Sequence, residues 1–141
     1  MKNHEKKPSV CNCLNLRRAS LAITKIYDEM LAPSGLTVSQ YSILKHLKHL
    51  GPVSVSELAL HIRLDRTTLV RSLKPLEAES FIMDISQKGT RNRQLQLTDK
   101  GMVKYLEAEA LWNQAQEYME QKIGRENIEK LTSLLTMIES L

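Results

Sequence analysis

Residues 54–77 read SVSELALHIRLDRTTLVRSLKPLE, and this stretch contains two short amphipathic segments with only a few residues between them. In the first segment Ser54 is followed three residues later by Glu57, a pattern that predicts a capping box at the start of a helix. Its apolar residues recur at helical spacing and therefore share one face. These residues are Val55, Leu58, Ala59 and Ile62.

The second segment begins at Asp65, which we predict to be the N-cap of another helix. Only a tight turn fits between the two helices, so the pair is predicted to be a helix-turn-helix. Pro75 lacks an N–H group, and we expect either a kink there or a helix that restarts at Lys74. The predicted buried face comprises Leu69, Leu73 and Leu76, with Val70 at its edge.

The outward face of the second helix carries cations and hydroxyls but no carboxylate. An arginine can bind guanine O6 and N7 together, and a threonine can contact a base edge or the thymine methyl group. We therefore take Thr67, Thr68 and Arg71 as candidate base contacts, with Lys74 on the same face. Arg66 points nearer the apolar side, so a structural ion pair or a phosphate contact explains it at least as well as base contact does.

Length and charge agree with such a unit. The chain has 141 residues and 42% hydrophobic content, which suits one packed domain with extensions. Its net charge of +4 permits a nucleic-acid partner without requiring one. Residues 1–10 are predicted to be a polar leader without the apolar core of a signal peptide, and no apolar run reaches the length of a membrane span. We therefore expect a cytoplasmic protein.

A basic hairpin is predicted directly after the helix-turn-helix. Phe81, Met83 and Ile85 alternate with polar or smaller residues, and Leu95 and Leu97 alternate with glutamines. The connection at 87–93 is polar and includes a glycine, as expected of a hairpin tip. Its three cations make it a candidate wing. They are Lys88, Arg91 and Arg93.

Helices are predicted on both sides of this unit. One runs from about Asn15 to the Pro33–Gly35 turn, and another begins with a capping box at Thr37 and Gln40. Two more follow Thr98, and the apolar period of the longer one includes Leu106 and Tyr118. These terminal helices hold more apolar surface than a small winged helix needs, which indicates a dimer interface. An intramolecular bundle is the alternative.

The predicted fold is therefore mainly α with a small β-hairpin wing. Residues 36–100 form a winged helix-turn-helix core. Residues 1–35 supply the leader and an N-terminal dimerisation helix, and residues 101–141 supply C-terminal dimerisation helices.

The order of these elements resembles the MarR family of bacterial transcriptional regulators across essentially the whole chain. Three motifs carry the resemblance: LTVSQYSILKHL at 36–47, VSVSELALHIRLDRTTLVRSLKPLEAESFI at 53–82 and RQLQLTDKG at 93–101. The resemblance implies a homodimer, most often a repressor, that binds double-stranded DNA at a pseudo-palindromic operator. It also implies that the helix from Asp65 enters the major groove and the wing lies along the minor groove. Many members release DNA when a small ligand, a metal or an oxidant acts.

The family's wing usually contains an Asp-x-Arg element, whose positions here are Gly89 and Arg91. The resemblance makes Arg91 the candidate for minor-groove contact. It also predicts a more mobile wing, because the carboxylate that would fix it is absent. An ordinary solvated loop is the alternative interpretation of Lys88, Arg91 and Arg93.

Cys11 and Cys13 are the two cysteines, and they lie at the start of the first predicted helix. Their spacing is poor for an intrachain disulfide. In a dimer with adjacent N-termini, two such pairs would supply four thiolates for a metal or an iron–sulfur cluster, or form an interchain disulfide. The alternative hypothesis is two incidental small residues.

Other side chains carry weaker patterns. His46, His49 and His61 show no fixed ligand spacing, and Trp112 suits core packing better than a ligand cavity. Phosphate loops, paired carboxylates and metalloprotease motifs are absent from the sequence, so we do not expect an enzyme. The alternative function is a winged-helix protein-interaction module that does not bind DNA.

Overall fold

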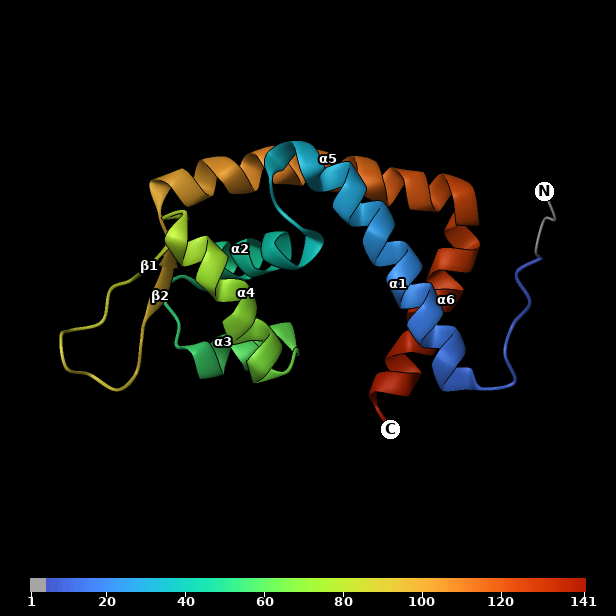
Figure 1. The fold of residues 1–141 in the computed structure, drawn as a ribbon, viewed down its shortest axis with the longest axis horizontal. Helices are drawn as coiled ribbons and strands as arrows, with labels where there is room; N and C mark the ends of the chain where they lie inside the picture. The colour runs from blue at the N-terminus through green and yellow to red at the C-terminus, as the bar shows by residue number, and fades with distance from the viewer. Residues whose placement is uncertain (1–4) are drawn as a thin grey trace.

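The computed structural model describes residues 5–141 and confirms the predicted fold class, a mainly helical chain with one small hairpin (Figure 1). Residues 1–4 of the predicted leader lie outside the described residues, and residues 5–11 contain no helix or strand. The elements are α1 Asn12–Leu31, the 3₁₀ helix η1 Ala32–Ser34, α2 Val38–Leu50, α3 Val55–Ile62, α4 Arg66–Ala78, β1 Ile82–Asp84, β2 Leu95–Leu97, α5 Asp99–Ile123 and α6 Arg125–Glu139.

The long helix α5 joins two parts of the molecule. Figure 1 shows α2, α3, α4 and the hairpin gathered under its N-terminal half, whereas α1 runs down from near its middle and α6 from its C-terminal end. Contacts of α5 with α1, α2 and α6 hold this arrangement together. None of the described helices is both long and apolar enough to cross a lipid bilayer.

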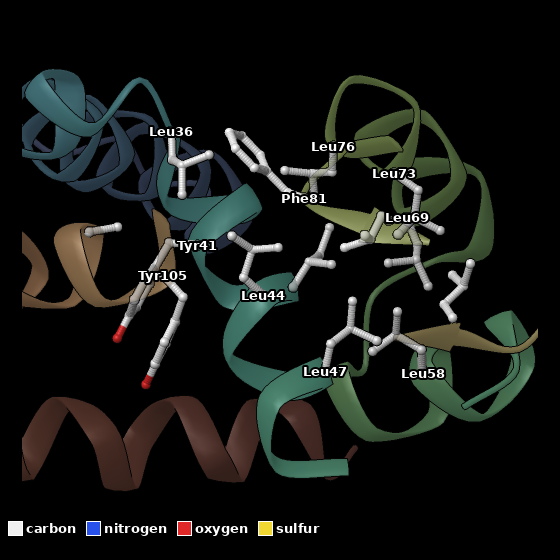
Figure 2. Close-up of a cluster of buried hydrophobic side chains, with 14 of the residues drawn as sticks. Leu36, Tyr41, Leu44, Leu47, Leu58, Leu69, Leu73, Leu76, Phe81 and Tyr105 are labelled. Carbon is white, nitrogen blue, oxygen red and sulfur yellow. The ribbon is translucent and has the colours of Figure 1, made fainter. Parts of the chain in front are cut away.

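The hydrophobic core lies between α2, α3, α4, the hairpin and the first half of α5 (Figure 2). Leu58, Leu69, Leu73 and Leu76 are buried, as their helical spacing predicted, and Val70 is partly exposed at the edge. A fully buried leucine contributes roughly 1.5–3 kcal/mol relative to an exposed one. We refer to α3, α4 and the hairpin together as the reading unit. Its own apolar face fixes it to α2 and α5.

The buried face of α5 differs from the predicted one. Tyr105 and Ala108 are buried, whereas Leu106 is 53% exposed and Tyr118 is 39% exposed. The physical reason is that α2 packs on this helix in one part and α1 and α6 in another. A single apolar period cannot describe a helix whose neighbours change along its length.

The hairpin forms where it was predicted, with Ile82 paired to Leu97 in an antiparallel register. Ile82 is buried, however, and Met83 and Ile85 are exposed, opposite to the simple alternation from Phe81. Ser80 has a φ of 61°, and this turn lets both Phe81 and Ile82 point into the core.

A third segment, which the sequence did not reveal, extends this small sheet. Val53, in the connection between α2 and α3, pairs with Leu95. The two residues exchange main-chain hydrogen bonds of 3.0 and 2.8 Å. The bridge attaches the start of the helix-turn-helix to the second strand of the wing.

Two predicted helix boundaries need correction. Helix α1 begins at Asn12 rather than near Asn15, because the Cys11 sulfur accepts the Leu14 N–H at 3.5 Å and caps the helix. Helix α4 continues through Pro75 to Ala78 and does not restart at Lys74. Pro75 lies on the exposed side, where solvent can satisfy the carbonyl that lost its N–H partner.

Candidate nucleic-acid interface

Side-chain caps define both helices of the helix-turn-helix. The Ser54 hydroxyl accepts the Glu57 N–H at 3.1 Å, and the Asp65 carboxylate accepts the Thr68 N–H at 3.0 Å. Of the capping box predicted at Ser54 and Glu57, only the bond from the Glu57 N–H to the Ser54 hydroxyl is formed among the described residues. At Thr37 and Gln40 both bonds of the predicted box are present, at 3.2 and 3.0 Å.

The turn between the two helices depends on an arginine in the left-handed conformation. Arg63 ends α3 with a φ of 56°, and its N–H donates to the Ala59 carbonyl at 2.9 Å. Its guanidinium reaches Glu139 at the end of α6, with 3.0 Å between Nε and Oε1. The turn of the reading unit is thereby linked to the terminal helices.

The outward face of α4 is placed as the sequence predicted. Thr67, Thr68, Arg71 and Lys74 are exposed on the side opposite the buried leucines. Arg66 is also exposed, and its guanidinium donates to the Ser56 hydroxyl at 3.2 Å. This bond ties the start of α4 to α3, but Ser56 is neutral, and Arg66 forms no ion pair within the described residues.

In the wing, Lys88 and Arg91 are exposed, and Gly89 takes a φ of 89° in the loop between them. Neither cation takes part in an ion pair within the described residues. Arg93 differs, because its guanidinium contacts the carboxylates of Glu77 at 2.5 Å and Asp84 at 3.3 Å. The sequence patterns did not identify either carboxylate.

Asp84 organises the base of the wing. Its Oδ1 atom accepts the main-chain N–H groups of Ser86 at 2.8 Å and Gln94 at 3.1 Å. Hydrogen bonds from Ser86, and after it from Gln94 and Arg93, lower the pKa of Asp84 to about 2. A carboxylate at the end of β1 therefore holds the two sides of the wing together at its base.

Aromatic side chains join α2 to α5 behind the reading unit. The rings of Tyr41 and Tyr105 stack with centroids 5.7 Å apart, and Trp112 stacks on Tyr41 at 5.6 Å. The Lys45 ammonium lies 4.3 Å from the Trp112 ring centroid. Trp112 thus packs against the core, as expected.

The remaining candidates lie apart from this surface. Cys11 and Cys13 are exposed at the start of α1. His46, His49 and His61 line one pocket of about 210 Å³ at α2 and α3. Across residues 5–141, no three His, Cys, Asp or Glu side chains are grouped so that they could hold a metal ion.

A helix-turn-helix followed by a basic hairpin defines a winged-helix protein, and comparison with known proteins agrees. The family model described as MarR family matches residues 36–89. The uncharacterized HTH-type transcriptional regulator YwoH of Bacillus subtilis is 28% identical over 92 residues, which cover 65% of this chain and 67% of YwoH.

Two solved regulators are similar over nearly the whole chain. The M. tuberculosis regulator MosR in complex with DNA is 30% identical with a TM-score of 0.77, and the match covers 92% of this chain and 97% of MosR. The repressor CouR bound to a 23-mer DNA duplex is 27% identical with a TM-score of 0.80, covering 92% of each chain. CouR bound to p-coumaroyl-CoA is similar too, with a TM-score of 0.81 at 26% identity, covering 92% of this chain and 91% of CouR.

The chain belongs to the MarR family and is a transcriptional regulator. This membership agrees with the expectation that it is not an enzyme.

Proposed function

We propose that the protein represses transcription by binding a pseudo-palindromic operator as a homodimer in the cytoplasm. The observation that carries the proposal is the exposed face of α4, which presents Thr67, Thr68, Arg71 and Lys74. The one carboxylate beside this face is the N-cap Asp65, which accepts the Thr68 hydroxyl. An exposed helix with this chemistry suits the major groove. Similarity to MosR and CouR, both solved with DNA, supports the same function.

Each of the proposed contact residues has its own task. Thr67, Thr68 and Arg71 contact base edges, and Lys74 and Arg66 contact the phosphate backbone at the ends of α4. In the wing, Arg91 enters the minor groove and Lys88 binds phosphate.

Operator binding can be tested with fragments selected from genomic DNA by the purified protein. Arg71→Ala should relax the preference for the selected sequence, because a bidentate base contact discriminates by about 1–3 kcal/mol. Arg91→Ala should weaken binding to all sequences more evenly. Lys25→Ala is the matched control, since Lys25 is exposed on α1 away from the reading unit.

The alternative function, a protein-interaction module, makes a different prediction. Binding to phosphates weakens steeply as salt rises, because neutralised phosphates release counterions. If the selected fragments bound with no salt dependence, or if Arg71→Ala and Arg91→Ala both bound like wild type, the DNA-binding proposal would be wrong.

The dimer is proposed from the terminal helices. Helix α6 has 15 residues and none of them is buried in the isolated chain. A helix of this length gains most of its stability from packing, so an apolar face this open needs a partner. A second copy covers it by two-fold symmetry. The exposed apolar residues are Leu14, Leu16 and Leu21 on α1 and Leu131, Leu134, Leu135, Met137 and Ile138 on α6.

Sedimentation of wild type and Leu135→Glu tests this interface. A buried, unpaired carboxylate in the interface should convert the dimer to monomer at micromolar concentration. Leu60→Glu is the matched control, because Leu60 is 77% exposed on α3 and lies outside the proposed interface. A monomeric wild type, or a Leu135→Glu variant that stays dimeric, would contradict the assignment.

For the effector we propose a small ligand or the exposed thiols of Cys11 and Cys13. Two thiols, one from each subunit, can form a disulfide as peroxide takes up their two protons and two electrons to give water. Four thiols of a dimer also fit a zinc or iron–sulfur site, which requires the second copy. Operator affinity before and after peroxide or Zn²⁺ should change in wild type only, and an equal response in Cys11→Ser/Cys13→Ser would exclude these cysteines.

A further inference from the structure

Arg93 lies between the wing and the recognition helix α4. Its Nη2 atom is 2.5 Å from Oε2 of Glu77, in the last turns of α4, and its Nε atom is 3.3 Å from Oδ2 of Asp84, at the end of β1. All three side chains are partly buried, with exposed fractions of 42%, 34% and 30%. One guanidinium thus joins two elements that both belong to the reading unit.

The charges around Arg93 distinguish it from the other wing cations. One guanidinium and two carboxylates sum to a charge of −1, so this cluster attracts no phosphate. The hydrogen bond that the guanidinium donates to Glu77 is the main factor that raises the pKa of Arg93. Lys88 and Arg91 have no such partners among residues 5–141 and remain available for DNA.

We refer to the contacts of Arg93 with Glu77 and Asp84 as the arginine bridge. Both carboxylates of this bridge are themselves held in place. Glu77 follows Leu76 and Leu73, which are buried in the core and fix the last turns of α4. Asp84 also accepts the N–H groups of Ser86 and Gln94, which close the base of the wing loop. The planar fork of an arginine can hold two carboxylates at a defined angle, and a lysine cannot.

We propose that Arg93 is a positioning residue that sets the angle between the wing and α4 through Glu77, and that it makes no DNA contact of its own. The proposal rests on the proposed DNA-binding function, which gives the angle its importance. Arg91 reaches the minor groove only when α4 and the wing meet the duplex together.

The two possible roles of Arg93 predict opposite effects of Glu77→Gln on operator affinity. If Arg93 bound phosphate, loss of the nearby carboxylate would free it and strengthen binding. If Arg93 positions the wing, Glu77→Gln should weaken operator binding by roughly tenfold, as expected when a wing contact is lost. Glu79→Gln is the matched control, because it removes the same charge two residues later from a side chain outside the bridge.

Arg93→Lys separates the two roles again. It keeps the positive charge but loses the fork, so it should weaken binding as Glu77→Gln does. Both substitutions change a partly exposed pair, and the global fold should remain intact. Equal affinity of Arg93→Lys and wild type, or tighter binding by Glu77→Gln than by Glu79→Gln, would overturn the proposal.

Hydrogen exchange in the absence of DNA makes the test independent of the proposed function. In the full-length free protein, Glu77→Gln and Arg93→Lys should increase amide exchange within residues 85–94, whereas Glu79→Gln should not. Unchanged exchange would overturn the positioning role even if DNA binding were established. Increased exchange in a protein that bound no DNA would refute the proposed function and leave the bridge in place.

Discussion

Gly101 packs directly against the carbonyl group of Phe81. A Cβ atom at Gly101 would overlap the Phe81 carbonyl oxygen and would lie 2.9 Å from Cδ1 of Leu97. The same carbonyl accepts the Thr98 N–H at 3.0 Å, and the Thr98 hydroxyl accepts the Gly101 N–H at 2.9 Å. The first turn of α5 is therefore fitted onto the start of β1 with no space for a side chain.

Gly101→Ala should lower the free energy of unfolding by about 1–3 kcal/mol, because overpacking displaces the main chain of Phe81. Helix propensity alone predicts the opposite sign, since alanine is favoured over glycine within a helix by about 1 kcal/mol. Urea denaturation measures the difference.

Gly35→Ala is the comparison for this prediction. Gly35 has a φ of 78°, and a Cβ atom added there would meet no other atom within 4 Å, so the cost of the substitution is conformational alone. Gly35→Asn should recover part of that cost, whereas Gly101→Asn should be worse than Gly101→Ala. A stabilising Gly101→Ala substitution would show that the contact relaxes freely.

The wing should lose order in acid. The pKa of Asp84 is about 2 in the folded protein and lies near 3.9 in an unfolded chain. A lowered folded-state pKa gives stability that is complete above about pH 4 and is lost as the pH falls toward 2. The difference in melting temperature between wild type and Asp84→Asn should therefore shrink between pH 5 and pH 2. A difference that does not vary over this range would contradict the role given to the Asp84 carboxylate.

Tyr41→Phe should leave stability unchanged or raise it by about 1 kcal/mol. The Tyr41 hydroxyl is buried and makes no hydrogen bond within the described residues, and an unpaired buried hydroxyl is costly. Burial, more than the neighbouring Tyr105 and Glu109, raises the pKa of Tyr41, so the phenol stays neutral. Phenylalanine keeps the ring stack with Tyr105. Urea denaturation that shows a loss of stability would mean that the hydroxyl has a partner.

Asp65→Ala should lower the melting temperature by roughly 2–4 °C through loss of the α4 cap. Asp65 accepts both the N–H and the hydroxyl of Thr68, at 3.0 and 2.5 Å, and these bonds lower the pKa of Asp65. Thr68→Val removes only the hydroxyl bond and should cost less. Circular dichroism melting compares the two variants. An equal fall in melting temperature in both would mean that the Thr68 hydroxyl bond alone, and not the Thr68 N–H bond, stabilises the start of α4.

Local sequence patterns predicted most of the fold because they encode contacts within one or two helical turns. Thr37 with Gln40, and Asp65 with Thr68, form their caps in the structure. The same locality explains why the buried leucines of α4 were placed correctly. Of the two outcomes expected at Pro75, a kink or a restart at Lys74, the restart does not occur, because a proline exposed at the surface can leave its helix unbroken.

The rest could not be predicted because it depends on which distant segments meet. Nothing near Arg93 in the sequence identifies Glu77 as its partner, and nothing near Val53 indicates Leu95. The hydrogen bond from the Gln94 N–H to Asp84 also depends on the hairpin register. Contacts of this kind are decided by packing, which brings the ends of β1 and α4 together.

The stack of Trp112 on Tyr41 has a practical consequence for experiments. The chain contains one tryptophan, and its indole lies where α5 meets α2, with the Lys45 ammonium over the ring. Indole emission responds to a nearby charge and to the polarity around the ring. The protein therefore carries an intrinsic optical reporter at the junction of its two parts, and a fluorescence titration can follow movement of α2 against α5 without any added label.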